Sequence, residues 1–295
     1  MQTQPKVVVI TGVSNGFGEG AVKSFADAGY RVWGTMRDAL GRNATKKATL
    51  EAHSPKISII EMDVADDASV ASCFARILSD SPINVLVNNA GIGYLGIAEA
   101  FSVVQAHEQM NTNYYGVIRT TQAVLPAMRK QGGGLINNCS STAGRISPPF
   151  FGTYSATKHA LEAYSQSLRY EVASFGIDVA IVQPGPFRSG FLAAMQQPAR
   201  TEVLEAYGPL AGIPPALAVS FAAMLSSPGA PDPQLVVDAY VSLAEKPAGQ
   251  RPTRTVVGID WGVAELNRLC QGTQDKVLHS MQLNETPLNR GVDSV

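Results

Sequence analysis

Short apolar runs rich in β-branched residues recur along this chain, separated by longer stretches with helical periodicity. Runs of this kind are typical of strands buried on both faces of a sheet. Strands that alternate with helices form right-handed βαβ units around a mostly parallel sheet. Strands are expected at residues 7–10, 31–35, 57–62, 85–87, 135–139, 177–182 and 255–257, and helices at residues 17–28, 68–78, 103–129 and 153–175. The pattern predicts one α/β domain over residues 1–295, with a doubly wound seven-stranded sheet in three αβα layers.

Composition narrows the class of protein. Hydrophobic residues make up 45% and charged residues 16%, as in an ordinary globular enzyme. A net charge of −1 without a basic cluster disfavours nucleic acid as a partner. The three cysteines are scattered, so no metal site or disulfide framework is expected, and a reduced, cytoplasmic setting fits. No signal peptide and no membrane span of about 20 apolar residues are expected.

A glycine-rich loop follows the first predicted strand and opens the first predicted helix. It reads Thr11-Gly12-Val13-Ser14-Asn15-Gly16-Phe17-Gly18. Glycines there permit a tight turn and close approach of a pyrophosphate, and the helix N-terminus supplies free N–H groups and a positive dipole end. The spacing is GxxxGxG, so the GxGxxG fingerprint does not apply directly. A nucleotide site is the favoured interpretation, and a loop that serves only packing is the alternative.

The end of the second predicted strand bears on which nucleotide could bind. An acidic residue there would hold a ribose 2′-hydroxyl, as in NAD, whereas an arginine can grip a 2′-phosphate in bidentate fashion. Arg37 lies 19 positions after Gly18 and is followed by Asp38. We therefore expect NADP(H), while Asp38 keeps NAD(H) possible. The alternative is a solvated Arg37 paired with Asp38.

Tyr154 and Lys158 form a pair of ionisable residues within Thr153-Tyr154-Ser155-Ala156-Thr157-Lys158. Residues four apart on a helix lie on the same face, one turn from each other. A phenol has an ordinary pKa of about 10, and a nearby ammonium favours the phenolate and lowers that pKa. The pair could therefore donate and accept a proton. Taken alone, the spacing also fits an ordinary solvated helix face.

Together with the glycine loop and the YxxxK pair, further motifs make the chain resemble a classical short-chain dehydrogenase/reductase. The likeness is close over about residues 6–189 and loose beyond. In the family's order, the matching motifs are Asp63-Val64, Asn88-Asn89-Ala90-Gly91, Asn113-Tyr114-Tyr115-Gly116, Ser140-Ser141-Thr142-Ala143-Gly144 and Pro184-Gly185. Phe17 stands where Ile is usual, and Ser189 stands where Thr is common. The resemblance implies a Rossmann-type sheet and an oxidoreductase that uses NAD(P).

The resemblance also implies roles for particular side chains. Tyr154 would donate the proton to a carbonyl oxygen, and Ser141 would hydrogen-bond the same oxygen, although Ser141 could instead only cap its loop. Lys158 would lower the pKa of Tyr154 and bind the nicotinamide ribose, and Asn113 would hold a water that links Lys158 to solvent. The implied cofactor contacts are Gly12, Ser14, Asn15, Gly16, Phe17, Gly18, Arg37, Asp63, Val64, Asn89, Ala90, Gly91, Tyr154, Lys158, Pro184, Gly185, Phe187 and Ser189.

Residues 184–232 break the alternation of strands and helices. They contain no strand-like run, and their prolines prevent one long helix. So long an insertion after the C-terminal end of a strand favours a lid over residues 186–232, and a surface excursion that covers the sheet edge is the alternative.

The expected pocket wall is mostly apolar, with Arg145 and Arg188 as the nearby cations. Its members are Ile92, Gly93, Tyr94, Leu95, Ile146, Pro148, Phe150, Phe151, Pro186, Phe187 and Phe191. The wall predicts an uncharged, hydrophobic ketone, aldehyde or secondary alcohol. A general likeness to hydroxysteroid and retinol dehydrogenases does not identify the substrate.

The resemblance implies a homodimer, with a tetramer possible, formed through the helices at residues 103–129 and 153–175. A helical extension is expected at residues 260–283 and would cover the face that tetramers use. Three other functions stay open at this point. They are an NAD-dependent alcohol dehydrogenase acting in the oxidative direction, an epimerase or dehydratase with a tightly held nucleotide, and a non-catalytic NADP-sensing protein.

Overall fold

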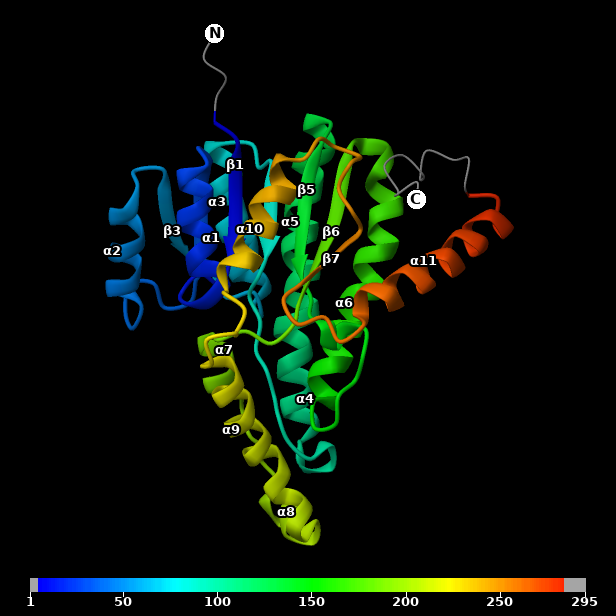
Figure 1. Cartoon of the computed structure of the whole chain (residues 1–295). Helices are drawn as coiled ribbons and strands as arrows, with labels where there is room; N and C mark the ends of the chain where they lie inside the picture. The colour runs from blue at the N-terminus through cyan, green and yellow to red at the C-terminus, as the bar shows by residue number, and fades with distance from the viewer. Residues whose placement is uncertain (1–4, 284–295) are drawn as a thin grey trace.

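A computed structural model of the chain describes residues 5–283. At its centre is a parallel seven-stranded sheet with the order β3-β2-β1-β4-β5-β6-β7 (Figure 1). The strands are β1 (Val7–Thr11), β2 (Arg31–Met36), β3 (Ile57–Glu61), β4 (Val85–Asn88), β5 (Gly134–Cys139), β6 (Ile177–Pro184) and β7 (Arg254–Val257). The predicted fold class is confirmed, and strand ends differ by a residue or two. The strand order reverses between β1 and β4, and ligands of such sheets bind at the carboxyl edge of that switch point.

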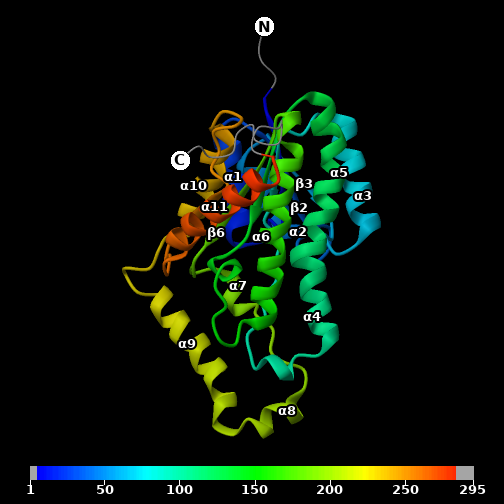
Figure 2. The ribbon, with the colours of Figure 1, turned by 90° about the vertical axis from the view of Figure 1, so that its right-hand side faces the viewer.

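Helices cover both faces of the sheet (Figure 2). One apolar layer contains Phe25, Leu50 and Tyr240, and the other contains Phe74, Val124 and Leu168. The first layer involves α1 (Gly16–Asp27), α2 (Ala44–His53) and α10 (Gln234–Glu245), and the second involves α3 (Asp67–Asp80), α5 (Gly116–Gln131) and α6 (Gly152–Val172). Burial of these two layers fixes the sheet between them.

The four predicted helical segments are confirmed: three are α1, α3 and α6, and the segment over residues 103–129 is one helical run that contains a π turn. It consists of α4 (Val103–Met110), a π-helical turn (Asn111–Tyr115) and α5. A π turn inserts one extra residue per turn and often marks a functional site. Helices α2 and α10 were not predicted. In α2 only Leu50 is buried, so its sequence has little apolar periodicity.

Residues 186–232 contain no strand and do not form one long helix, as predicted. They form α7 (Gly190–Ala193), α8 (Thr201–Ala206), a 3₁₀ turn (Gly208–Gly212) and α9 (Ile213–Leu225). Helices α8 and α9 form an arm that projects from the body below the carboxyl edge of the sheet (Figures 1 and 2). By length and composition alone, Gly208–Leu225 is also a weak candidate for a membrane span, which the sequence analysis did not anticipate.

The C-terminal part confirms the expected helical extension as α11 (Val263–Ser280). This helix follows β7 and lies beside α6 (Figures 1 and 2). Residues 1–4, on which the expectation of no signal peptide rests, lie outside the described residues.

Candidate active site

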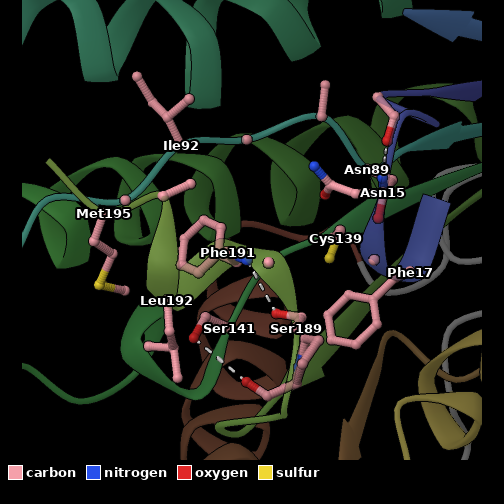
Figure 3. Close-up of a pocket in the computed structure, with 18 of the residues that line it drawn as sticks. Asn15, Phe17, Asn89, Ile92, Cys139, Ser141, Ser189, Phe191, Leu192 and Met195 are labelled. Atoms are coloured by element: carbon pink, nitrogen blue, oxygen red, sulfur yellow. Dashed lines mark hydrogen bonds between the residues drawn. The ribbon is translucent and has the colours of Figure 1, made fainter. Parts of the chain in front are cut away.

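A cavity of about 480 Å³ opens at the carboxyl edge of the sheet, where the sequence places its motifs. Its nucleotide end is lined by Gly12, Ser14, Asn15, Gly16, Phe17, Arg37, Arg42, Asn43, Asp63 and Val64. Its substrate end is lined by Ile92, Gly93, Pro148, Phe151, Phe191, Leu192, Ala194, Met195, Phe221 and Trp261. Between the two ends lie Cys139, Ser140, Ser141, Tyr154 and Lys158. Figure 3 shows Asn15, Phe17 and Asn89 on one side and Phe191, Leu192 and Met195 on the other.

Backbone geometry builds the nucleotide end. Gly12 and Gly16 have φ of +71° and +59°, a region that residues with a Cβ avoid. A Cβ on Gly12 would lie 2.7 Å from the Cα of Ala90. Asn89 fixes the loop because its Nδ2 donates to the carbonyl oxygens of Thr11 (3.0 Å) and Gly12 (3.1 Å). Asn15 precedes α1 without a side-chain cap, so the first N–H groups of that helix stay available to an anion.

Two residues of this loop have different roles. Phe17 lines the cavity, and its ring packs edge-on against Phe187, another lining residue, with centroids 5.5 Å apart. Gly18 does not line the cavity. A Cβ there would lie 2.3 Å from the carbonyl oxygen of Gly12, so Gly18 lets α1 pack against the loop. The expected cofactor contact is thus not supported for Gly18, and the packing alternative describes it.

Two arginines line the nucleotide end after β2. The side chain of Arg37 is 60% exposed, with Nη1 3.9 Å from Asp63 Oδ2, so the alternative pairing with Asp38 is wrong. Asp38 turns back on its own loop and accepts from the Arg42 N–H at 3.1 Å. Asp38 does not line the cavity, whereas Arg42 does. Sequence reasoning missed Arg42 because only the path of the loop brings it to the same cavity as Arg37.

Tyr154 and Lys158 lie on one face of α6 and line the same cavity, as the spacing predicted. They are 8% and 5% exposed. Lys158 Nζ donates to the carbonyl oxygen of Cys139 at 2.8 Å and lies 5.8 Å from the centroid of the Tyr154 ring. The ammonium is therefore held between the end of β5 and the phenol.

The direction of the Tyr154 shift differs from the expectation. Burial raises the pKa of Tyr154 well above its ordinary value, and the Ser141 hydroxyl opposes this only in part through a hydrogen bond. Burial lowers the pKa of Lys158, while the charge of Glu162 opposes that change. The expected lowering of the phenol pKa by Lys158 is thus wrong for this arrangement. Loss of water around each group is the largest cause of its pKa shift.

Ser141 precedes a 3₁₀ turn (Thr142–Gly144), and both of its predicted functions are compatible with the structure. Its Oγ accepts from the Ala143 N–H at 3.1 Å, which makes it a loop cap. The same hydroxyl donates to the carbonyl oxygen of Pro184 at 3.4 Å and lines the cavity (Figure 3). The cap holds the hydroxyl at the centre of the site.

Asn113 does not line the cavity. It lies in the π turn, fully buried, and its Oδ1 accepts from the Ile92 N–H at 2.8 Å. Its Nδ2 donates to the Ile92 carbonyl oxygen at 2.9 Å and to Thr157 Oγ1 at 3.0 Å. Asn113 thus ties the segment after β4 to the helix α6 that carries Tyr154 and Lys158, and its expected contact with water stays a prediction.

The substrate end is apolar, as expected, but some of the residues that line it differ from those predicted. Tyr94, Leu95, Ile146 and Phe150 do not line the cavity, whereas the other predicted wall residues do. Tyr94 is buried, and its hydroxyl donates to Glu108 at 3.1 Å. Sequence reasoning missed Phe221 and Trp261, whose rings lie 6.5 Å apart. Their chain positions carry no motif. Only the path of α9, for Phe221, and that of the connection between β7 and α11, for Trp261, reveal them.

The two expected cations lie elsewhere. Arg145 donates from Nε to Asn267 Oδ1 at 3.0 Å, and Arg188 is exposed. Neither lines the cavity. Among the described residues, the substrate end is therefore lined without a charged side chain.

Comparison with known proteins supports this geometry. The model of the family described as short chain dehydrogenase matches residues 6–200.

This chain belongs to the short-chain dehydrogenase family.

The resemblance drawn from its motifs is confirmed. The chain is 39% identical over 189 residues to a 3-ketodihydrosphingosine reductase of Bacteroides thetaiotaomicron, covering 64% of this chain and 66% of that protein. It is 37% identical over 195 residues to retinol dehydrogenase 8 of Homo sapiens, covering 65% and 62%. The matches to these two curated short-chain dehydrogenases thus span somewhat less than two thirds of their length.

Other relatives match over nearly the whole chain. An uncharacterised oxidoreductase of Escherichia coli K12 is 32% identical over 281 residues, covering 92% of this chain and 94% of that protein. A short-chain dehydrogenase from Streptomyces avermitilis is 31% identical, with a TM-score of 0.77 and coverage of 96% and 98%. An actinorhodin polyketide ketoreductase solved with NADPH is 25% identical, with a TM-score of 0.72 and coverage of 89% and 99%.

Proposed function

We propose that this protein is an NADP(H)-dependent oxidoreductase that interconverts a hydrophobic ketone or aldehyde and the corresponding alcohol. One observation carries the proposal. A single cavity joins a nucleotide end built from glycines to Tyr154, Lys158 and Ser141, and then to an uncharged apolar wall. Membership of the short-chain dehydrogenase family supports it, as do relatives named as a reductase and a retinol dehydrogenase.

The nucleotide end fits a dinucleotide. Gly12 and Gly16 allow close approach of a pyrophosphate, and α1 presents its uncapped N-terminus to the cavity. The residues that would hold the cofactor are the predicted contacts without Gly18, joined by Arg42 and Asn43. A bound nicotinamide nucleotide would supply or accept the hydride.

The preference for NADP(H) rests on charge. Arg37 and Arg42 both line the nucleotide end, and guanidinium groups suit a 2′-phosphate. Asp38, which would suit a 2′-hydroxyl, is held by the Arg42 N–H and does not line the cavity. Arg37 lies 3.9 Å from Asp63 and Arg42 lies 3.7 Å from Asp38, so both pairs are loose and their guanidinium groups stay available to a 2′-phosphate.

Tyr154 acts as the proton donor in the reductive direction. Since burial raises the pKa of Tyr154, the phenol stays protonated at neutral pH. Ser141, at the same point of the cavity, hydrogen-bonds the reacting oxygen. The Lys158 ammonium, 5.8 Å from the centroid of the phenol ring, stabilises the negative charge that develops as the proton leaves.

The substrate is an uncharged molecule with a bulky apolar part. Phe151, Phe191 and Phe221 line its end of the cavity, and no described charged side chain lies there to neutralise an anion. Residues 186–232 act as a lid, because α9 brings Phe221 against Phe151, with centroids 6.2 Å apart. An apolar cover of this kind excludes water from the reacting carbonyl.

The protein assembles as a homodimer through α4, α5 and α6. Val103 and Val104 on α4 and Phe175 just after α6 are exposed, and apolar surface of this kind is typical of an interface. Light scattering that gives a mass of one or four chains would contradict this assembly.

The decisive experiment replaces the phenol. Tyr154→Phe should reduce turnover of hydrophobic ketones with NADPH by about 100- to 10,000-fold, the usual contribution of a general acid. Binding of NADPH should persist, because the glycine loop and the arginines are unchanged. Tyr164→Phe removes a phenol from the same helix outside the cavity and serves as the control. Substantial turnover by Tyr154→Phe would refute the assignment.

A further inference from the structure

A buried carboxylate lies one helical turn after Lys158. Glu162 on α6 is 2% exposed and accepts from Arg254 Nε and from Gln183 Nε2, each at 2.8 Å. Its negative charge raises the pKa of Lys158 against the effect of burial. Such a buried ion pair is costly unless its atoms are hydrogen-bonded, and here both carboxylate oxygens are.

The network continues to the C-terminal helix. Asn267 on α11 donates from Nδ2 to Gln183 Oε1 at 2.7 Å and accepts at Oδ1 from Arg145 Nε at 3.0 Å. Asn267 thus uses its amide as donor and acceptor at once, which few side chains of its size can do. Figures 1 and 2 show α11 beside α6, at the opposite end of the sheet from β3.

Both ends of this network are close in the chain to residues that line the cavity. Arg145 follows directly on the 3₁₀ turn that Ser141 caps. Gln183 precedes Pro184, whose carbonyl oxygen accepts from Ser141 Oγ. The turn is packed tightly on α6, since a Cβ on Gly144 would lie 3.0 Å from Glu162 Cγ and 3.2 Å from the Lys158 carbonyl oxygen.

We propose that Asn267 is a positioning residue, through which α11 holds the Ser141 turn against the face of α6 that carries Lys158 and Glu162. Helix α11 lies beyond residues 6–200, which match the family model. The C-terminal extension would thus help to position the site without lining it. The expected effect of Asn267 on kinetics rests on the function proposed above, whereas its expected effect on the stability of the Ser141 turn does not.

Hydrogen–deuterium exchange tests the structural part without cofactor or substrate. Asn267→Ala should speed exchange across residues 140–146, where the amides of Ala143 and Gly144 bond to Ser141. Gln271→Ala is the matched control, because it removes an amide one turn further along the same helix, where that amide donates to Asp275 instead of joining the network. Unchanged exchange in a folded Asn267→Ala protein would overturn the proposal, as would equal acceleration by Gln271→Ala.

Steady-state kinetics test the positioning part. Asn267→Ala should lower kcat about tenfold or more, with the Kd for NADPH within about twofold of the wild type, because the nucleotide end is untouched. Loss of NADPH affinity in parallel with kcat would indicate general damage and overturn the assignment. If the wild type reduces no carbonyl, the proposed function fails, and the exchange experiment still decides the role of Asn267.

A second variant guards against a failure to fold. Arg145→Met cuts the same network at its loop end and should give the same two effects. In the double variant the losses in kcat should be smaller than the product of the single losses, because both changes break one connection. Fully multiplicative effects would show that the two residues act independently and would overturn the network.

Discussion

The two ends of the cavity are built by different means. The nucleotide end depends on backbone, since Gly12 and Gly16 with positive φ and the N-terminus of α1 shape it. The substrate end depends on side chains from segments far apart in the chain, including Ile92, Phe151, Phe221 and Trp261. A site shaped by backbone conformation accepts only glycine at certain positions, whereas an apolar wall can be built from many different side chains. Motifs therefore mark the first end and leave the second almost unmarked.

The largest effect should follow a change at the backbone-built end. Gly12→Ala should weaken NADPH binding about 100-fold or more, because a Cβ would lie 2.7 Å from the Cα of Ala90 at a φ of +71°. Gly272→Ala is the control, since a Cβ there meets no described atom within 4 Å. Isothermal titration with NADPH measures both, and near-normal binding by Gly12→Ala would mean that the loop can rearrange.

The pH dependence should separate the two directions of the reaction. Because burial raises the pKa of Tyr154, the phenolate needed to oxidise an alcohol is scarce at neutral pH. Oxidation should therefore rise by up to about tenfold per pH unit from pH 7 to 9, whereas reduction should stay nearly flat. Profiles of kcat in both directions test this, and an oxidation rate independent of pH would contradict the raised pKa.

Cofactor selectivity probes charge at the nucleotide end. Arg37→Asp should shift the ratio of kcat/KM for NADPH over NADH by about tenfold or more toward NADH, the usual scale for a lost charged hydrogen bond. Arg188→Asp changes charge equally at an exposed site outside the cavity and should leave the ratio unchanged. An unaltered ratio in Arg37→Asp would remove that residue from phosphate recognition.

The smallest effect is expected at the substrate end, where many side chains share the contact. Phe221→Ala on α9 should raise KM for a bulky hydrophobic ketone by about five- to tenfold, without changing NADPH binding. Val219→Ala, on an exposed face of the same helix, is the control. Equal KM values for both variants would show that the arm does not cover the substrate.

Sequence patterns alone predicted the sheet and most of the site. Buried β-branched runs have one stable arrangement when helices alternate with them, so all seven strands were found. They did not predict α2, whose single buried side chain leaves no periodicity, or the π turn at Asn113. Tyr94 follows the Asn88–Gly91 motif closely, but its side chain is buried in the interior and does not line the cavity. The local sequence does not reveal this orientation.

The sequence by itself determined which residues are available for the chemistry. They are the glycines of the nucleotide loop, where the backbone must approach a ligand closely, and the side chains of Ser141, Tyr154 and Lys158. Tertiary structure decided the rest. Burial set the direction of the Tyr154 and Lys158 pKa shifts, and the loop after β2 brought Arg42 to the same cavity as Arg37. The arm placed Phe221, the connection between β7 and α11 placed Trp261, and α11 placed Asn267. Limits on backbone conformation act within a few residues, so they produce recognisable sequence motifs. Solvation and packing depend on neighbours that only the folded chain brings together.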